Sequence, residues 1–110
     1  MEVTVDASAL LAVAFDEPER ASIIEATTGA TLIAPAALPY EIGNALTAMY
    51  KRGRLEERLV RSAWEATQKI PVRLVAIEVE VAITMAVANG LYAYDAYYLY
   101  CALAHQRPLV

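Results

Sequence analysis

The sequence predicts an α/β fold, a helix-rich three-layer α/β/α sandwich built around a small parallel sheet. Short apolar segments that fit strands alternate along the chain with longer segments of helical periodicity, the pattern of βαβ units. The helical segments outnumber the strands. The chain has 110 residues, of which 58% are hydrophobic, enough for one domain with its own core. We therefore expect a single domain spanning residues 1–110.

The first elements follow from alternation and capping signals. Glu2–Asp6 places valines on alternate positions and reads as a short strand that ends at an acidic residue. Ser8 is an N-cap candidate for a helix that begins with the apolar run Ala9–Ala14. A second helix of about ten residues is expected between Pro18 and Gly29, because proline is favoured at the first helical turn and glycine just past the last.

A second strand and a long helix come next. Thr31–Ala34 is a short apolar strand that Pro35 stops. The helix expected after it begins near Pro39 and ends at Gly53. Its apolar residues recur at the spacing i, i+4, i+7 as Ile42, Leu46 and Met49.

The second half of the chain continues the alternation. Leu55–Ile70 has apolar residues on one side and charges on the other, which predicts an amphipathic helix. Val72–Val75 reads as the third strand, and Glu78–Ala88 as a helix. Tyr94–Gln106 is expected as the last helix, and Pro108–Val110 as the start of another strand.

Composition narrows the possible classes of protein. The longest apolar stretches, Ala7–Phe15 and Val81–Ala88, fall short of the ~20 residues of a membrane-spanning helix, so no membrane association is expected. A single cysteine, Cys101, permits no internal disulfide and fits a reducing cytoplasm. The net charge of −4 argues against a broad basic surface for nucleic acid. We expect a soluble cytoplasmic protein.

The basic residues are distributed unevenly. Five of the nine lysines and arginines stand in one short stretch, as Lys51, Arg52, Arg54, Arg58 and Arg61. A solvated helix surface is the favoured interpretation, because Glu57 and Arg61 have i,i+4 spacing. An edge that contacts phosphates is the alternative.

Three acidic residues stand where functional groups gather in parallel α/β folds, at the ends of separate elements. Asp6 follows the first strand, at the edge of the sheet where ligands bind in such folds. Glu41 lies at the start of the long helix with Asn44 three residues on, so both project from one side. Asp95 opens the last helix. A purely structural role remains open for each acid. Asp6 or Ser8 could cap the first helix, and Asp95 could cap the last. Glu41 could be a first-turn glutamate that the helix dipole favours.

A shared metal ion is the functional alternative to these capping roles. Mg²⁺ and Mn²⁺ prefer oxygen ligands, and a divalent cation compensates the mutual repulsion of clustered carboxylates. Such an ion can activate a water for in-line attack on a phosphodiester. We therefore predict a hard-cation site formed by Asp6, Glu41 and Asp95.

The order of these residues resembles the PIN-domain family, and most closely the VapC-type toxins of toxin–antitoxin pairs. The resemblance is carried by three motifs in the family's order and spacing: Val5-Asp6-Ala7-Ser8, Pro39-Tyr40-Glu41-Ile42-Gly43-Asn44-Ala45-Leu46, and Tyr94-Asp95-Ala96-Tyr97-Tyr98-Leu99 followed by Ala102-Leu103-Ala104. It covers essentially the whole chain.

The resemblance implies a Mg²⁺- or Mn²⁺-dependent endoribonuclease that acts on RNA, forms a homodimer and is neutralised by a cognate antitoxin. Asp6, Glu41 and Asp95 would be its metal-binding and catalytic residues, with Ser8 and Asn44 as supporting polar residues. The family continues from the position of Pro108-Leu109-Val110 into a strand end of the type Thr-x-Asp, which supplies a fourth acid. This sequence stops before it, so we expect the 110-residue form to bind metal weakly.

Two other functions compete with the ribonuclease. One is a catalytically incomplete PIN-like module for protein interaction. The other is a phosphatase-like metal hydrolase of another α/β family, against which the helix-borne Glu41 and Asp95 argue.

Aromatic residues and the cysteine are expected to have packing roles. Five of the seven tyrosines stand between positions 92 and 100, where core or dimer packing is favoured over stacking on RNA bases. Trp64 is expected to anchor one helix against another, and Cys101 to be a small buried residue.

Overall fold

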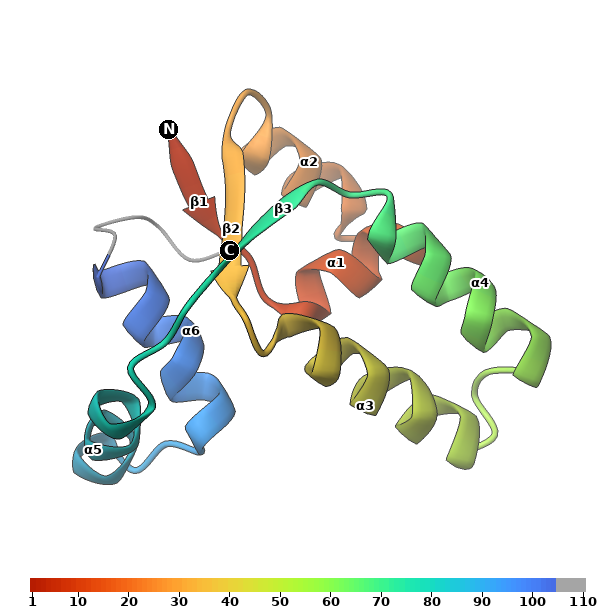
Figure 1. The fold of residues 1–110 in the computed structure, drawn as a ribbon. Coiled ribbons are helices and arrows are strands. Elements are labelled where there is room, and N and C mark those ends of the chain that lie inside the picture. The colour runs from red at the N-terminus through yellow and green to blue at the C-terminus, as the bar shows by residue number, and fades with distance from the viewer. Residues whose placement is uncertain (105–110) are drawn as a thin grey trace.

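The computed structural model describes residues 1–104, which form three strands and six helices (Figure 1). The elements are β1 (Glu2–Thr4), α1 (Ala7–Ala14), α2 (Arg20–Thr27), β2 (Thr31–Pro35), α3 (Leu38–Lys51), α4 (Glu57–Gln68), β3 (Val72–Val75), α5 (Val79–Asn89) and α6 (Ala93–Ala104). They occur in the predicted order. The strand expected at Pro108–Val110 lies outside the described residues.

The three strands form one parallel sheet in the order β1-β2-β3. Val3 pairs with Leu32, and Ile33 pairs with Arg73. The ladder extends one residue past β1, because the Val5 N–H donates to the Ile33 carbonyl at 2.9 Å. The carboxyl ends of all three strands therefore lie at one edge of the sheet, and the loops that leave them lead into helices α1, α3 and α5.

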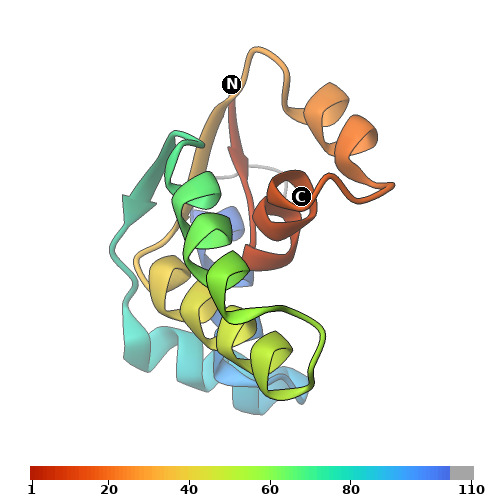
Figure 2. The same cartoon turned by 90° about the vertical axis from the view of Figure 1, so that its right-hand side faces the viewer.

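Side chains of β1 point alternately to the two faces of the sheet, and each face is covered by helices. Val3 and Val5 are 1% exposed and pack in the main core with residues of α1 and α3. Thr4 points to the opposite face, where its hydroxyl contacts the Cys101 sulfur of α6 at 4.0 Å. Helices α1, α3 and α4 accordingly pack on one side of the sheet and α6, with α5 against it, on the other (Figures 1 and 2). The predicted α/β/α sandwich is confirmed.

The two sides differ in the size of their side chains. The larger cluster contains Leu10, Ile42 and Leu46, and full burial of each such side chain stabilises the fold by about 1.5–3 kcal/mol. Between α5 and α6 the buried residues are the alanines Ala82, Ala86 and Ala96. Cys101 is buried as predicted. Among the described residues, no helix is long and apolar enough to cross a membrane.

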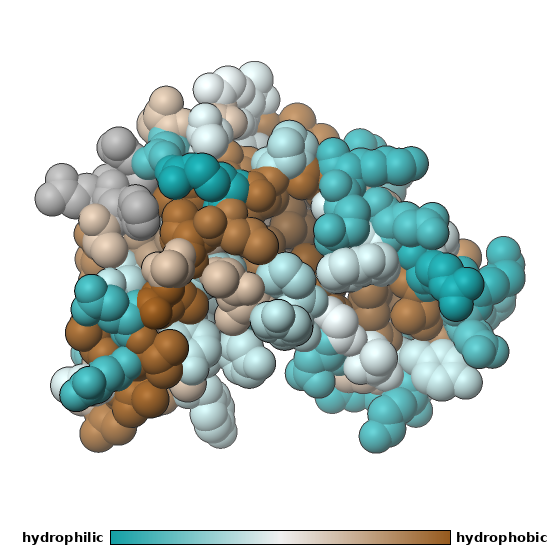
Figure 3. Space-filling model, viewed as in Figure 1, coloured by the Kyte–Doolittle hydropathy of each residue, from teal (hydrophilic) through white to brown (hydrophobic). Residues whose placement is uncertain are grey.

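Helix α5 carries an unusual number of apolar side chains that face solvent. Val79, Val81, Ile83 and Val87 are 45–79% exposed. In the space-filling view, hydrophobic residues gather over α5 at the lower left, whereas hydrophilic residues dominate the far ends of α3 and α4 (Figure 3). The surface is thus divided into an apolar end and a charged end.

Candidate metal centre

Asp6 occupies the turn between β1 and α1 and caps the helix. Its Oδ1 accepts hydrogen bonds from the Ala9 N–H at 2.9 Å and from the Ser8 hydroxyl at 2.8 Å. The expectation that Ser8 caps this helix is wrong, because the helix begins at Ala7 and Ser8 already lies within it. Ser8 instead orients the Asp6 carboxylate. Both bonds reach the same oxygen, and no hydrogen bond to Oδ2 is found in the described part of the chain.

Glu41 lies in the first turn of α3, where Pro39 sets the helical backbone. Its Oε2 is buried and has no hydrogen-bond partner in residues 1–104. Burial raises the pKa of the Glu41 carboxyl above its ordinary value of 4.5, and the charges of Asp6 and Asp95 raise it further.

Tyr98 of α6 approaches the same carboxylate from the opposite layer. Its side chain is 4% exposed, and its hydroxyl faces Glu41 closely enough to lower the pKa of that carboxyl. Burial and the neighbouring Glu41 in turn raise the pKa of the Tyr98 phenol. The geometry is not that of a formed hydrogen bond, since the Tyr98 hydroxyl and Glu41 Oε2 are both without a partner among the described residues. The sequence interpretation assigned Tyr98 only to packing; its position one turn after Asp95 was the available signal.

Asp95 lies in the first turn of α6 and is exposed. The expectation that it caps this helix is wrong, because the helix begins two residues earlier, at Ala93. The Ala96 N–H bonds to the Tyr92 carbonyl at 3.1 Å, which completes the first turn without the Asp95 side chain. The Asp95 carboxylate is therefore not used to cap the backbone of α6. The helix itself is only partly buried, since Tyr94 and Leu103 are exposed on it.

Asn44 follows Glu41 on α3 and is exposed. Its backbone carbonyl accepts a hydrogen bond from the Thr47 hydroxyl at 3.1 Å, so the backbone there is occupied within the helix. No hydrogen bond to its side-chain amide is found within residues 1–104.

Asp6 and Asp95 both raise the pKa of the Glu41 carboxyl, but the three acids do not form a closed ligand set among the described residues. In residues 1–104 no group of three histidine, cysteine or acidic side chains lies close enough together to hold a metal ion. The chemistry of the donors nevertheless fits a hard cation: all are carboxylate oxygens, and one of them, Glu41 Oε2, is buried without a partner. The shared cation site of Asp6, Glu41 and Asp95 therefore stays a prediction.

A hollow of about 610 Å³ between α1 and α2 opens beside Asp6. Alanines of α1 and Ile23 line it, and Glu17 and Glu19 bring two further acidic side chains to its wall. Asp6 therefore borders two acidic environments, one shared with Glu41 and one with the start of α2.

Comparison with known proteins assigns the family. The family model described as "PIN domain" matches residues 3–110. The chain belongs to the PIN domain family. The fold of PIN domains is generally of the nuclease type. The crystal structure of PAE2754 from Pyrobaculum aerophilum is similar to this PIN domain, with a TM-score of 0.73 and 29% sequence identity over 99% of this chain and 78% of that chain. No curated protein matches the sequence.

Proposed function

We propose that this PIN domain is a Mg²⁺- or Mn²⁺-dependent endoribonuclease of the VapC toxin type. The observation that carries the proposal is Glu41, whose buried Oε2 has no partner among residues 1–104 while Asp6 and Asp95 raise the pKa of its carboxyl. A carboxylate that is desolvated beside two others is the environment that a divalent cation compensates. Membership of a family with a nuclease-type fold supports the same activity.

Asp6, Glu41 and Asp95 would hold the cation, which when bound supplies an activated water and neutralises charge on the phosphodiester. The chain's own residues prepare this position. Ser8 and the Ala9 N–H fix one oxygen of Asp6. Tyr98 holds its hydroxyl toward Glu41 and helps to keep water from that carboxylate.

Asn44 contributes at the solvent side of the same helix. Its amide is exposed one turn from Glu41, and an amide can donate to a phosphate oxygen of RNA. We propose this supporting role for Asn44, as Ser8 supports Asp6.

Two protein partners belong to the proposal, a cognate antitoxin and a second copy of the chain. The acid-lined hollow beside Asp6 supports an antitoxin with a basic side chain, because such a residue would find Glu17 and Glu19 there. The exposed apolar side chains of α5 support a homodimer, since a contiguous apolar surface of this kind marks an association site. Sedimentation of the Val87→Asp variant tests the dimer: we expect monomers, and an unchanged dimer would contradict this surface.

The activity is tested by RNA cleavage with Mn²⁺ or Mg²⁺, with and without EDTA. Asp6→Asn and Asp95→Asn should abolish cleavage, as should EDTA, while both variants remain folded. The remaining aspartate offers a matched control: Asp16 is exposed, lies in a turn with a φ of 54° that asparagine tolerates, and pairs with Arg20. Asp16→Asn should cleave normally. Equal cleavage by all three variants would contradict the proposed site.

A catalytically incomplete interaction module remains the second candidate. The observation that favours it is that the three acids do not form a ligand cluster in the described part of the chain. Purified protein that folds but leaves RNA intact at every metal concentration would support this alternative.

A further inference from the structure

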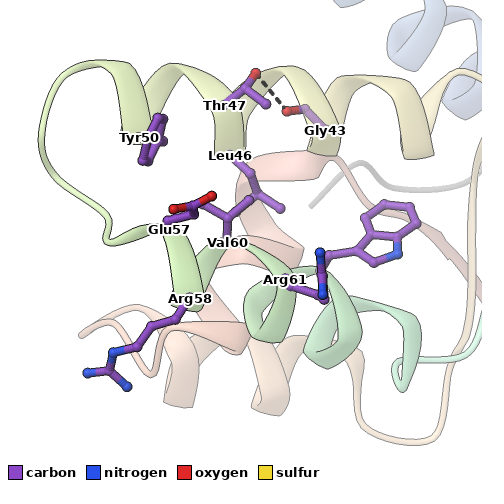
Figure 4. A pocket seen from close by; sticks show the side chains of 9 residues that line it. Gly43, Leu46, Thr47, Tyr50, Glu57, Arg58, Val60 and Arg61 are labelled. Carbon is purple, nitrogen blue, oxygen red and sulfur yellow. Dashed lines mark hydrogen bonds between the residues drawn. The ribbon is translucent and has the colours of Figure 1, made fainter.

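One hollow among the described residues lies away from the candidate metal centre, between α3 and α4 (Figure 4). Its volume is about 800 Å³. One wall is a row of α3 residues and the other a row of α4 residues, each with helical spacing. The residues that form the two walls include Leu46, Thr47, Tyr50, Val60, Arg61 and Trp64. We call this hollow the α3–α4 groove.

The groove stands at the basic end of an acidic protein. Residues 51–61 hold five basic and two acidic side chains, a formal charge of +3, whereas the rest of the chain carries −7. All five basic residues are exposed. Arg58 pairs with Glu56 at 3.0 Å, and no ion pair is found for the other four in the part of the chain that the structure describes. The field at this end therefore attracts a polyanion.

Aromatic rings accompany these charges. Tyr50 is 49% exposed, and Trp64 is half-buried against the core with the rest of its ring lining the groove. Figure 4 shows Arg61 toward one end of the groove and Tyr50 near the other. Exposed aromatic rings beside arginines are the combination that binds single-stranded nucleic acid, with bases on the rings and phosphates on the cations.

The helical positions on α3 relate the groove to the candidate metal centre. Glu41 lies in the first turn and Tyr50 in the last, roughly 13 Å further along the helix axis. Because each residue turns the helix by about 100°, Tyr50 projects from the side of α3 opposite to Glu41. Thr47 and Tyr50 line the groove. The groove is therefore a surface separate from the acids, on another face of the same helix.

We propose that the α3–α4 groove binds single-stranded RNA. Bases stack on Tyr50 and Trp64, while Arg61 and the basic turn at residues 51–54 contact phosphates. The only acidic side chain that lines the groove in the described residues is Glu57, and the surrounding cations outweigh it. The inference rests on the proposed ribonuclease function, because it assigns the substrate of that site a second contact surface.

Trp64 makes the groove directly observable, since it is the only tryptophan of the chain. A single-stranded RNA of about twelve nucleotides, a length within the usual site sizes, is titrated in EDTA so that no cleavage occurs. We expect the RNA to quench Trp64 fluorescence. Tyr50→Ala should weaken binding roughly ten-fold through lost stacking. Arg61→Gln should reduce the slope of log affinity against log salt by about 0.7.

Matched variants distinguish binding in the groove from a general loss of positive charge or of folding. Arg20→Gln removes an exposed arginine of α2 that lies outside the groove and should leave affinity and salt slope unchanged. Tyr50 and Arg61 are both exposed, so their variants are expected to fold, and Trp64→Phe provides a second stacking variant that keeps a ring against the core.

The outcomes distinguish this inference from the proposed function. RNA that binds without quenching Trp64, or with equal affinity in Tyr50→Ala and Arg61→Gln, would overturn the groove while leaving cleavage possible. Quenching that a poly-glutamate peptide reproduces at equal charge would also overturn it and indicate an acidic protein partner. Groove-dependent RNA binding in a protein that never cleaves RNA would support the groove and contradict the ribonuclease.

Discussion

The two ends of helix α3 carry opposite charges and serve different purposes in this account. At its N-terminal end, Glu41 is desolvated beside two aspartates and below the Tyr98 hydroxyl. At its C-terminal end, Lys51 begins a run of exposed cations that borders the α3–α4 groove. Both arrangements agree with the helix dipole, which favours acids at the start of a helix and bases at its end.

The difference shows how an acidic protein can act on a polyanion. The carboxylates that would hold a cation repel RNA by themselves, so attraction has to come from elsewhere on the surface. The basic end supplies it from the last residue of α3, the turn that follows and the start of α4, away from the acids. Metal binding and the attraction of RNA are therefore assigned to different side chains. Substitutions should accordingly affect one property without the other.

The largest expected effect comes from the acidic end. Glu41→Gln keeps the shape of the side chain but removes the charge that faces Asp6 and Asp95, so cleavage of RNA should fall by about 100-fold or more. RNA affinity in EDTA should not fall. Cleavage rates and RNA binding are measured on the same preparation, with Glu25→Gln on the exposed face of α2 as control. Retained cleavage would remove Glu41 from the site.

A charge reversal at the basic end should have the converse effect. Arg54→Glu exchanges an exposed cation in the turn after α3 and should weaken RNA binding about ten-fold at low salt, with less effect at high salt. The rate at saturating RNA should remain unchanged, because Arg54 stands apart from the acids. A lower kcat with an unchanged KM would contradict the separation of the two ends.

The pH dependence of stability reports on the acidic end alone. Because the pKa of Glu41 is raised above 4.5 in the folded protein, the folded state keeps a proton that the unfolded chain has already released. The free energy of unfolding contributed by this group therefore falls as pH rises from 4.5 through the folded pKa. Urea unfolding across this range should show the fall in the native protein. Glu41→Gln should not show that component, and identical curves would contradict the raised pKa.

The smallest expected effect is that of Tyr98→Phe. Within the described part of the chain its hydroxyl is buried without a partner, so its loss should leave stability unchanged or raise it by up to about 1 kcal/mol. Since this hydroxyl lowers the pKa of Glu41, its removal should also extend the pH dependence of stability to higher pH. Tyr92→Phe, at an 85% exposed position, is the control. A loss of several kcal/mol would mean that the hydroxyl is bonded after all.

Local sequence signals predicted the elements well. The strand Val72–Val75 was predicted with the bounds that the structure shows, and the long helix was displaced by only one residue at its start and two at its end. Prolines and glycines set most of these limits, and they act through their own backbone, without help from distant residues. The alternation of Val3, Thr4 and Val5 similarly fixed which residues face each layer.

The side-chain roles were harder to predict. Asp6 and Ser8 both have side chains that are good helix caps. The choice between them depends on where β1 stops pairing with β2, after the hydrogen bond from the Val5 N–H to the Ile33 carbonyl. That pairing is a tertiary contact. The approach of Tyr98 to Glu41 joins helices on opposite sides of the sheet, and the only sequence signal for it was the position of Tyr98 one turn after Asp95. The same is true of the α3–α4 groove, whose basic residues the sequence favoured as a merely solvated surface.

The central claim is that Asp6, Glu41 and Asp95 share one divalent cation, and calorimetric titration with Mn²⁺ tests it most directly. The account predicts a saturable site in the native protein that is lost in Asp6→Asn, Glu41→Gln and Asp95→Asn and retained in Asp16→Asn. Binding of Mn²⁺ that survives all three substitutions, or a native protein that takes up no Mn²⁺ while remaining folded, would contradict it.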